Sequence, residues 1–270
     1  MSLGFTDNGF PPSPFPPQWA SSWGQDQYGL WAALQIEEVE QVMRWIRPGR
    51  FLMGSPKGEL ERSDDEVQHK VTLTDGYWLA DSACTQELWG KVMDNNPSEF
   101  KGGDKLPVDS VSWDDCQEFM SIVSDKLNGV KLRFPSEAQW EYACRAGTQT
   151  SYSFDDKITT DQVNYNGKYT YKDGTEGVYR ECTVAVKSFT RNHWGLYQMH
   201  GNVWEWCSDW YGEYPEGASF DPEGADLGWF RVLRGGCWID YGGSVRSAVR
   251  DRSRQDSLGR GIGFRFSLDQ

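Results

Sequence analysis

The sequence lacks the paired cysteines and histidines that would mark a zinc site. Its six cysteines stand singly along the chain, at Cys84, Cys116, Cys144, Cys182, Cys207 and Cys237. Structural zinc needs ligands in close pairs, so we expect no zinc and reduced, mostly buried thiols. The chain has 3 histidines in all. An iron site built from His69, His193 and His200 is therefore an alternative rather than the main expectation.

Long apolar runs are also missing. No stretch of eighteen apolar residues occurs, which predicts no membrane insertion. Residues 1–17 contain no basic segment followed by an apolar one, so we expect no secretory signal and a cytoplasmic location. The net charge of -13 argues against nucleic-acid binding, because phosphate contacts need a basic face.

The composition is that of a large globular domain. The chain has 270 residues, of which 38% are apolar, and 14 are tryptophan, which is enough material for a sizeable core. Met1–Trp23 is rich in proline and aromatic residues, and proline disfavours helix, so this stretch is predicted to be extended. We therefore expect residues 1–41 to form an arm that packs on a main domain of residues 42–270.

Regular elements are predicted mainly in the first half of the chain. Strands are expected at 43–46, 49–53 and 69–80, the last broken at Asp75-Gly76. A short amphipathic helix is expected at 85–93. Ser112, followed by acidic residues, begins a second helix, and the capping box of Ser136 and Gln139 begins a third. Later residues favour short strands and long loops, so we predict an α+β fold with two or three helices and short twisted antiparallel sheets.

A tryptophan-rich stretch after residue 200 holds a candidate metal ligand. Trp204, Trp206 and Trp210 lie at alternating positions, as in a strand, and Glu205 points to the opposite face. An acid next to a Gly-Asn turn is suited to calcium, which takes carboxylate and carbonyl oxygens together. The alternative is an acid that is satisfied by backbone donors or by one of the late arginines.

A polar segment near the C-terminus is the candidate binding surface. A strand ending in Gly235-Gly236 precedes it and a strand at 261–266 follows it. Long irregular segments held by a scaffold commonly bind ligands, and this one mixes aromatic anchors with small polar residues. The predicted contact residues are Trp238, Ile239, Asp240, Tyr241, Gly243, Ser244, Asp251, Arg252, Ser253, Arg254, Gln255, Ser257, Leu258 and Arg260. The arginines in the flanking motifs are expected to be structural, namely Arg234, Arg246, Arg250 and Arg265.

Six motifs occur in a characteristic order: GRFLMGSP, SWDDCQEF, LRFPSEAQWEYACRAG, GLYQMHGNVWEWCSDWYG, RVLRGGCW and GIGFRF. In this the chain resembles the sulfatase-modifying-factor family, the group of the formylglycine-generating enzymes. The resemblance spans residues 42–268 and implies an elaborated C-type-lectin fold. It also implies structural calcium bound by the side chains of Gln198 and Glu205 and the carbonyls of Gly201 and Val203.

The resemblance also bears on catalysis. The oxidising enzymes of the family hold copper with two cysteines that follow the Arg-Gly-Gly turn. This chain has Cys237 there, while the expected cysteine positions read Asp240 and Gly243-Ser244. Because copper(I) is selected by soft thiolate ligands, we expect no copper site.

Another branch of the same family binds ligands. The variable proteins of bacterial diversity-generating retroelements keep the scaffold and mutate the C-terminal segment, and the polar residues of this chain resemble that pattern. We therefore expect a non-catalytic protein that binds a protein or cell-surface ligand. The alternatives are a copper or non-haem-iron oxidoreductase with non-standard ligands, suggested by Cys237 and His200, and a structural or regulatory module.

Overall fold

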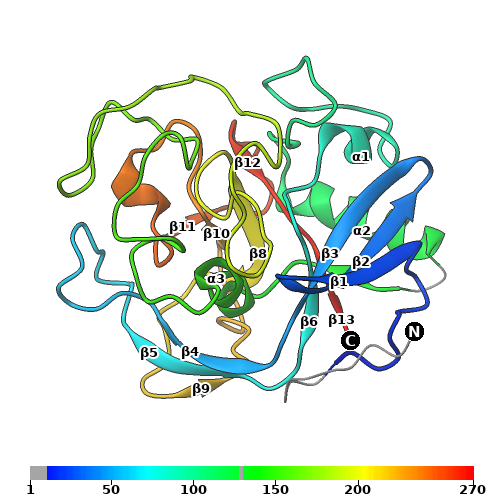
Figure 1. The fold of residues 1–270 in the computed structure, drawn as a ribbon, viewed down its shortest axis with the longest axis horizontal. Helices are drawn as coiled ribbons and strands as arrows, with labels where there is room; N and C mark the ends of the chain where they lie inside the picture. The colour runs from blue at the N-terminus through cyan, green and yellow to red at the C-terminus, as the bar shows by residue number, and fades with distance from the viewer. Residues whose placement is uncertain (1–10, 128–129) are drawn as a thin grey trace.

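The computed structural model describes residues 11–127 and 130–270, which form three β-sheets and a few helices (Figure 1). The six-stranded sheet has the order β1-β2-β3-β6-β13-β7. Its strands are β1 (Ser22–Asp26), β2 (Gly29–Ile36), β3 (Val39–Ile46), β6 (Tyr77–Ala80), β7 (Leu132–Arg133) and β13 (Ser267–Asp269). All of its neighbouring strands pair antiparallel.

Two smaller sheets complete the β-structure. The four-stranded sheet has the order β11-β10-β8-β12 and the three-stranded sheet the order β4-β5-β9. Their strands are β4 (Gly49–Met53), β5 (His69–Leu73), β8 (Trp204–Trp210), β9 (Ser219–Phe220), β10 (Arg231–Arg234), β11 (Arg250–Ser253) and β12 (Ile262–Gly263). The predicted strands at 43–46, 49–53 and 69–80 are confirmed. The expected strand at 261–266 is present only as β12, and the chain pairs again in β13.

The described residues form three α-helices: α1 (Gln86–Gly90), α2 (Trp113–Lys126) and α3 (Glu137–Arg145). Both predicted caps of the longer helices are confirmed. The Asp115 N–H donates to the Ser112 hydroxyl and the Gln139 N–H to the Ser136 hydroxyl, at 3.0 and 3.2 Å. Each cap residue's own N–H bonds back to the side chain three residues on, which completes the capping box.

The N-terminal region is more regular than the predicted arm. Residues 22–41 form β1, β2 and the beginning of β3, and they pair within the six-stranded sheet. Ala32, Ala33 and Leu34 are fully buried there, so this stretch contributes to the core directly. Upstream of β1, Phe15 and Trp19 pack against Trp78 with ring centroids 6.4 and 5.5 Å away. The boundary drawn at residue 41 therefore falls inside a strand.

The hydrophobic core has two large parts. One lies against the six-stranded sheet and includes the stacked rings of Trp89 and Phe119, 5.3 Å apart. The other surrounds Trp140 of α3 and the strands β4 and β5. Among the described residues, no helix has the length and apolarity needed to cross a membrane. The four-stranded sheet, between these two parts, carries the polar C-terminal segment.

Candidate functional site

Two buried arginines, Arg234 and Arg246, fix the first part of the polar segment, which is the loop between β10 and β11. Arg234, at the end of β10, donates to the carbonyls of Ser247, Ala248 and Val249 and pairs with Glu141 of α3. The loop between β10 and β11 therefore begins and ends at the Arg234 guanidinium. The buried charge of Arg234 is compensated through Nη1 and Nη2, which bond to carbonyl and carboxylate oxygens, while the buried Nε has no partner among the described residues.

Arg246 connects the middle of the β10–β11 loop to a second loop, the one that precedes β5. Its guanidinium lies 2.6 Å from a Glu59 oxygen and 2.9 and 2.8 Å from the two Glu66 oxygens. Its Nε also donates to the Gly243 carbonyl at 2.9 Å, just below the 3-10 turn at Gly242–Val245. As predicted, the flanking arginines are structural, and they fix a segment that has little apolar packing of its own.

The predicted contact residues fall into three groups by exposure. The side chains that reach solvent are Ile239, Tyr241, Asp251, Arg252, Arg254, Leu258 and Arg260. A second group is half-buried: Asp240, Ser244, Ser253, Gln255 and Ser257. Trp238 and Gly243 are buried. The first group, together with the accessible parts of the second, defines what we call the C-terminal face.

Trp238 and Gly243 belong to the scaffold in this structure. Trp238 is 4% exposed and its ring packs against Phe100 at 5.1 Å, so it is not the surface anchor expected from the sequence. Its backbone N–H bonds to the Asn202 carbonyl. At Gly243, a Cβ would lie 1.8 Å from a carboxylate oxygen of Glu61, so a larger residue would force that side chain away.

The two parts of the C-terminal face lie near each other. Burial is the main cause that raises the pKa of Asp240, but the charge of Asp251 on β11 raises it as well. Beyond β11, the Gln255 carbonyl accepts from the N–H groups of Trp113 and Asp114 at 3.0 and 3.4 Å. The loop therefore satisfies free donors at the beginning of α2 and is held in place by them.

Exposed apolar residues next to this face were not predicted from the sequence. Leu227 and Trp229 are 86% and 85% exposed, and the Arg252 guanidinium lies 5.6 Å from the ring of their neighbour Phe230. Trp229 and Arg254 line a cavity of about 370 Å³. The sequence signal that could have indicated these residues is the presence of apolar side chains in a stretch rich in Gly and Asp. That stretch has neither the period of a strand nor the period of a helix, so no pattern in it predicts that these side chains are buried.

The predicted calcium ligand Glu205 is engaged by other groups. Its two carboxylate oxygens accept from the Arg265 guanidinium at 2.6 and 2.8 Å, and one also accepts from the Trp140 indole at 2.7 Å. Both charged side chains are buried. A divalent ion at this carboxylate would lie beside a guanidinium, so the residues present do not fit calcium. The arrangement matches the alternative of an acid paired with a late arginine.

Two other residues of the implied calcium set, Gln198 and Gly201, also make hydrogen bonds within the protein. The Gln198 side-chain oxygen accepts from the Lys187 N–H at 2.6 Å, and its amide nitrogen donates to the Ala185 carbonyl. The Gly201 carbonyl accepts from the N–H of Val203 at 2.9 Å. These contacts fix the loop before β8.

The residues of the oxidoreductase alternative do not meet. Cys237 is 3% exposed, and burial raises the pKa of its thiol. His200 bonds to the Val245 carbonyl and to Ser153, and its Nε2 lies 3.6 Å from the sulfur of Cys144 rather than beside Cys237. Within residues 11–127 and 130–270, no three His, Cys, Asp or Glu side chains are grouped to hold a metal.

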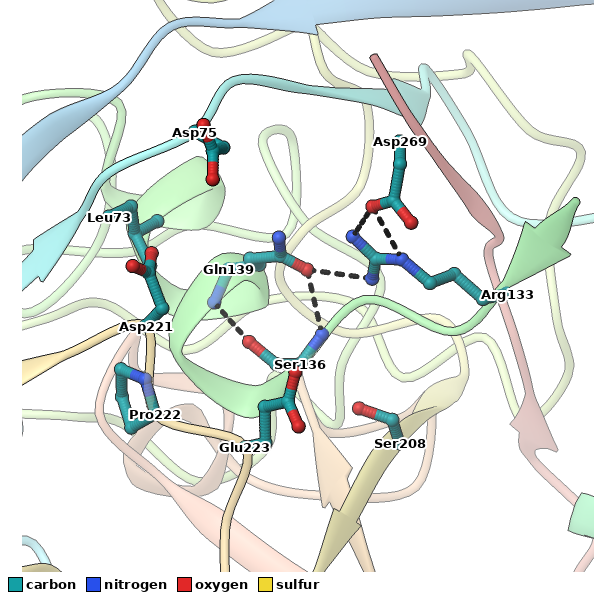
Figure 2. Close-up of a pocket in the computed structure, with 10 residues that line it drawn as sticks. All are labelled: Leu73, Asp75, Arg133, Ser136, Gln139, Ser208, Asp221, Pro222, Glu223 and Asp269. Atoms are coloured by element: carbon teal, nitrogen blue, oxygen red, sulfur yellow. Dashed lines mark hydrogen bonds and ion pairs between the residues drawn. The ribbon is translucent and has the colours of Figure 1, made fainter.

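The larger cavities lie away from the C-terminal face, along residues 208–225. One of about 430 Å³ is polar, and Figure 2 shows the acidic side chains Asp75, Asp221 and Glu223 on one side and the Arg133–Asp269 pair on the other. The C-terminal face borders the cavity lined by Trp229 and Arg254, and its exposed side chains form a surface that suits a macromolecule better than a small molecule.

The fold and the site together define a class: an α+β domain of the elaborated C-type-lectin type, with a polar C-terminal segment on a stiff frame. Residues 32–270 match the model of the sulfatase-modifying factor enzyme 1-like domain, and the chain belongs to this family. The formylglycine-generating enzyme of Streptomyces coelicolor is 35% identical over 182 residues, 64% of this chain and 55% of that protein. The serine/threonine-protein kinase pkn1 of Chlamydia caviae is 30% identical over 267 residues, 85% of this chain and 39% of the relative.

Solved structures confirm the fold. Variable protein 1 of Treponema denticola superposes with a TM-score of 0.77 at 26% identity, covering 89% of this chain and 99% of that one. PvdO from Pseudomonas aeruginosa gives a TM-score of 0.71 at 22% identity, over 93% and 99% of the two chains, which shows the shared fold alone. The chain spans about half or less of the two curated relatives named above, so their activities are not carried over to it.

Proposed function

We propose that this protein is a non-catalytic binding protein that takes a protein ligand on the C-terminal face. The observation that carries the proposal is the separation of roles within one segment. Arginines 234, 246 and 265 are fully buried and paired, while Tyr241, Arg252 and Arg254 between them reach solvent. The fold similarity to a variable protein supports the same reading.

The chemistry of the face favours a protein partner. Tyrosine and arginine are enriched where binding energy concentrates, and the exposed Trp229 and Leu227 add a neighbouring apolar area. Arg252 is positioned by stacking on Tyr211, at 4.5 Å from its ring, so part of its conformational freedom is already lost before binding. The buried, protonated thiol of Cys237 offers no comparable support for redox chemistry.

Site-specific photo-crosslinking tests the proposal. A benzophenone amino acid is placed at Tyr241, and in a second variant at Trp229, and each protein is irradiated with cell-surface protein fractions. We expect one discrete protein adduct shared by both variants. The matched control carries the crosslinker at Phe220 of β9, an aromatic residue 68% exposed in the three-stranded sheet, and should not form that adduct.

A second measurement concerns natural variation. If the segment is diversified, coding sequences from independent isolates will differ at exposed positions such as Tyr241 and Arg252 and will keep Trp238, Gly243 and Arg246. Variation that falls equally on buried and exposed positions, or an adduct that forms equally from Phe220, would contradict the proposal.

A further inference from the structure

A second cleft lies between β5, the beginning of α3 and the loop that follows β8. It has a volume of about 200 Å³ and its lining includes His69, Glu137, Asp209, Tyr214 and Pro215. His69, Tyr214 and Pro215 also line an adjoining, wider cavity of about 860 Å³, so the cleft opens towards solvent on that side. None of these residues belongs to the C-terminal face.

His69 presents an unused acceptor in the cleft. Its Nδ1 lies 2.9 Å from the Val67 carbonyl, which only accepts, so Nδ1 carries a proton and, in the neutral ring, Nε2 has the free lone pair. Nε2 is buried, and no described residue hydrogen-bonds to it. The side chain is 7% exposed and its ring is fixed against Tyr214, with centroids 4.7 Å apart. A buried polar atom without a partner is costly, which favours a ligand at this position.

Asp209 presents a second acceptor. Its Oδ2 accepts from the Glu137 N–H at 2.8 Å and from the Ser208 hydroxyl at 3.0 Å. Among the residues that the structure describes, none donates to Oδ1. Gly224 lies against this carboxylate and also lines the cleft, and a Cβ there would lie 3.0 Å from Oδ1, so a larger residue would crowd the oxygen.

The charge in the cleft is negative. Glu137 is balanced by Arg250, with Nε–Oε1 and Nη2–Oε2 distances of 2.7 and 2.8 Å. In the described part of the chain no lysine or arginine forms an ion pair with Asp209, and the acids Glu213 and Glu223 stand at the rim. Burial, together with the charge of Glu137, raises the pKa of Asp209 to about 7.

We propose that this cleft binds a small organic cation, an alkylammonium, whose N–H groups donate to Asp209 Oδ1 and His69 Nε2. The hydrocarbon part of such a ligand would lie against the Tyr214 ring and the prolines 215 and 222, which supply the apolar wall. A metal ion fits less well, since the described residues offer two free acceptors here rather than a full ligand set. An anion would meet unbalanced negative charge.

The neighbouring polar cavity suggests that the cleft accepts longer amines. It shares Pro222 and Glu223 with the cleft, and Figure 2 shows Asp221 and Glu223 beside this shared wall. A second ammonium at the far end of a diamine would meet these carboxylates. Diamines are therefore expected to bind more tightly than monoamines of the same length.

Titration of the intact protein with n-butylammonium at pH 8, where Asp209 is ionised, tests the proposal. Binding is followed by the imidazole NMR signals of the three histidines and by calorimetry. A ligand of this size is expected to bind with a Kd in about the millimolar range. The His69 signals should shift on binding, while those of exposed His193 should not. n-Butanol, which has the same carbon chain without the charge, and tetramethylammonium, which has no N–H donor, should bind at least tenfold more weakly.

Two variants with one matched control locate the site. Asp209→Asn and His69→Phe should each weaken n-butylammonium binding at least tenfold. Glu216→Gln, which removes the same charge from the rim of the wider cavity but not from the cleft, should leave the Kd unchanged. Equal binding of butanol, or equal loss in Glu216→Gln and Asp209→Asn, would overturn the proposal. If a variant does not fold, the His69 shift in the unmodified protein decides the question alone.

Discussion

The buried pair of Arg265 and Glu205 allows a direct test of whether this carboxylate serves an arginine or a cation. Arg265 makes both contacts to Glu205 and also donates to the carbonyls of Ala80 and Tyr197, at 3.1 and 3.0 Å. It thereby joins the four-stranded sheet to β6 of the six-stranded sheet. Removing the guanidinium leaves a charged carboxylate and two carbonyls without these donors in a buried site.

Arg265→Met is the informative change because methionine keeps most of the volume. Truncating one partner of a buried ion pair costs about 3–5 kcal/mol of unfolding free energy. For a domain of this size that lowers Tm by on the order of 10 °C. Glu205→Gln keeps an oxygen for the Trp140 indole, and combined with Arg265→Met it removes both charges. The loss of unfolding free energy in the double variant should therefore be at least about 2 kcal/mol smaller than the sum of the losses in the two single variants.

Calorimetry with and without calcium completes the test. If Arg265 takes the place of a cation, the Tm of the unmodified protein will be equal in EGTA and in calcium. A calcium ion bound at this site at 100 times its Kd would add about 2.7 kcal/mol and give a plain upward shift. A calcium-dependent rise in Tm that disappears in Glu205→Gln, or strictly additive single variants, would refute the reasoning.

Three further predictions concern the scaffold. Arg246→Met should lower stability by about 3–5 kcal/mol in urea denaturation because buried Glu66 loses its partner, whereas Arg254→Met, at an exposed arginine of the same segment, should change it by less than about 0.5 kcal/mol. Burial lowers the pKa of His200 to about 4, below the ordinary 6.5 of an unfolded chain. The protein should therefore lose about 3 kcal/mol of stability as the pH falls from 6.5 to 4. This part of the acid sensitivity should be absent in His200→Asn. Burial raises the pKa of Asp209 to about 7, so its ionisation opposes folding increasingly from about pH 4 to 7. Asp209→Asn should therefore be more stable than the unmodified protein at pH 8, by up to about 4 kcal/mol. This gain in stability should vanish near pH 4.

Local signals in the sequence were sufficient where the structure depends on neighbouring residues. The helices α2 and α3 begin at Ser112 and Ser136, as predicted, because a capping box lies within four residues of chain. The tryptophan strand β8 was also predicted, since alternation is a local pattern. The motif order identified the family and with it the fold.

Long-range pairing and burial were beyond the sequence pattern. Residues 29–36 form a strand because β3 and, beyond it, β6 complete the sheet beside it, and no local pattern marks those partners. Trp238 lies in a segment that is rich in glycine and polar residues, which predicted exposure; Phe100, far away in the sequence, packs against it. The cleft at His69 and Asp209 joins residues 140 positions apart, and only the folded chain brings them together.

The position of β13 makes the six-stranded sheet depend on the last residues of the chain. This strand lies between β6 and β7, so the six-stranded sheet is closed by residues that follow the C-terminal face in the chain (Figure 1). A frameshift or stop codon within residues 238–260 would remove that strand as well as part of the C-terminal face. Such a product would leave β7 and one edge of β6 without a partner, so the C-terminal face cannot be lost from the chain without loss of the strand that joins these two.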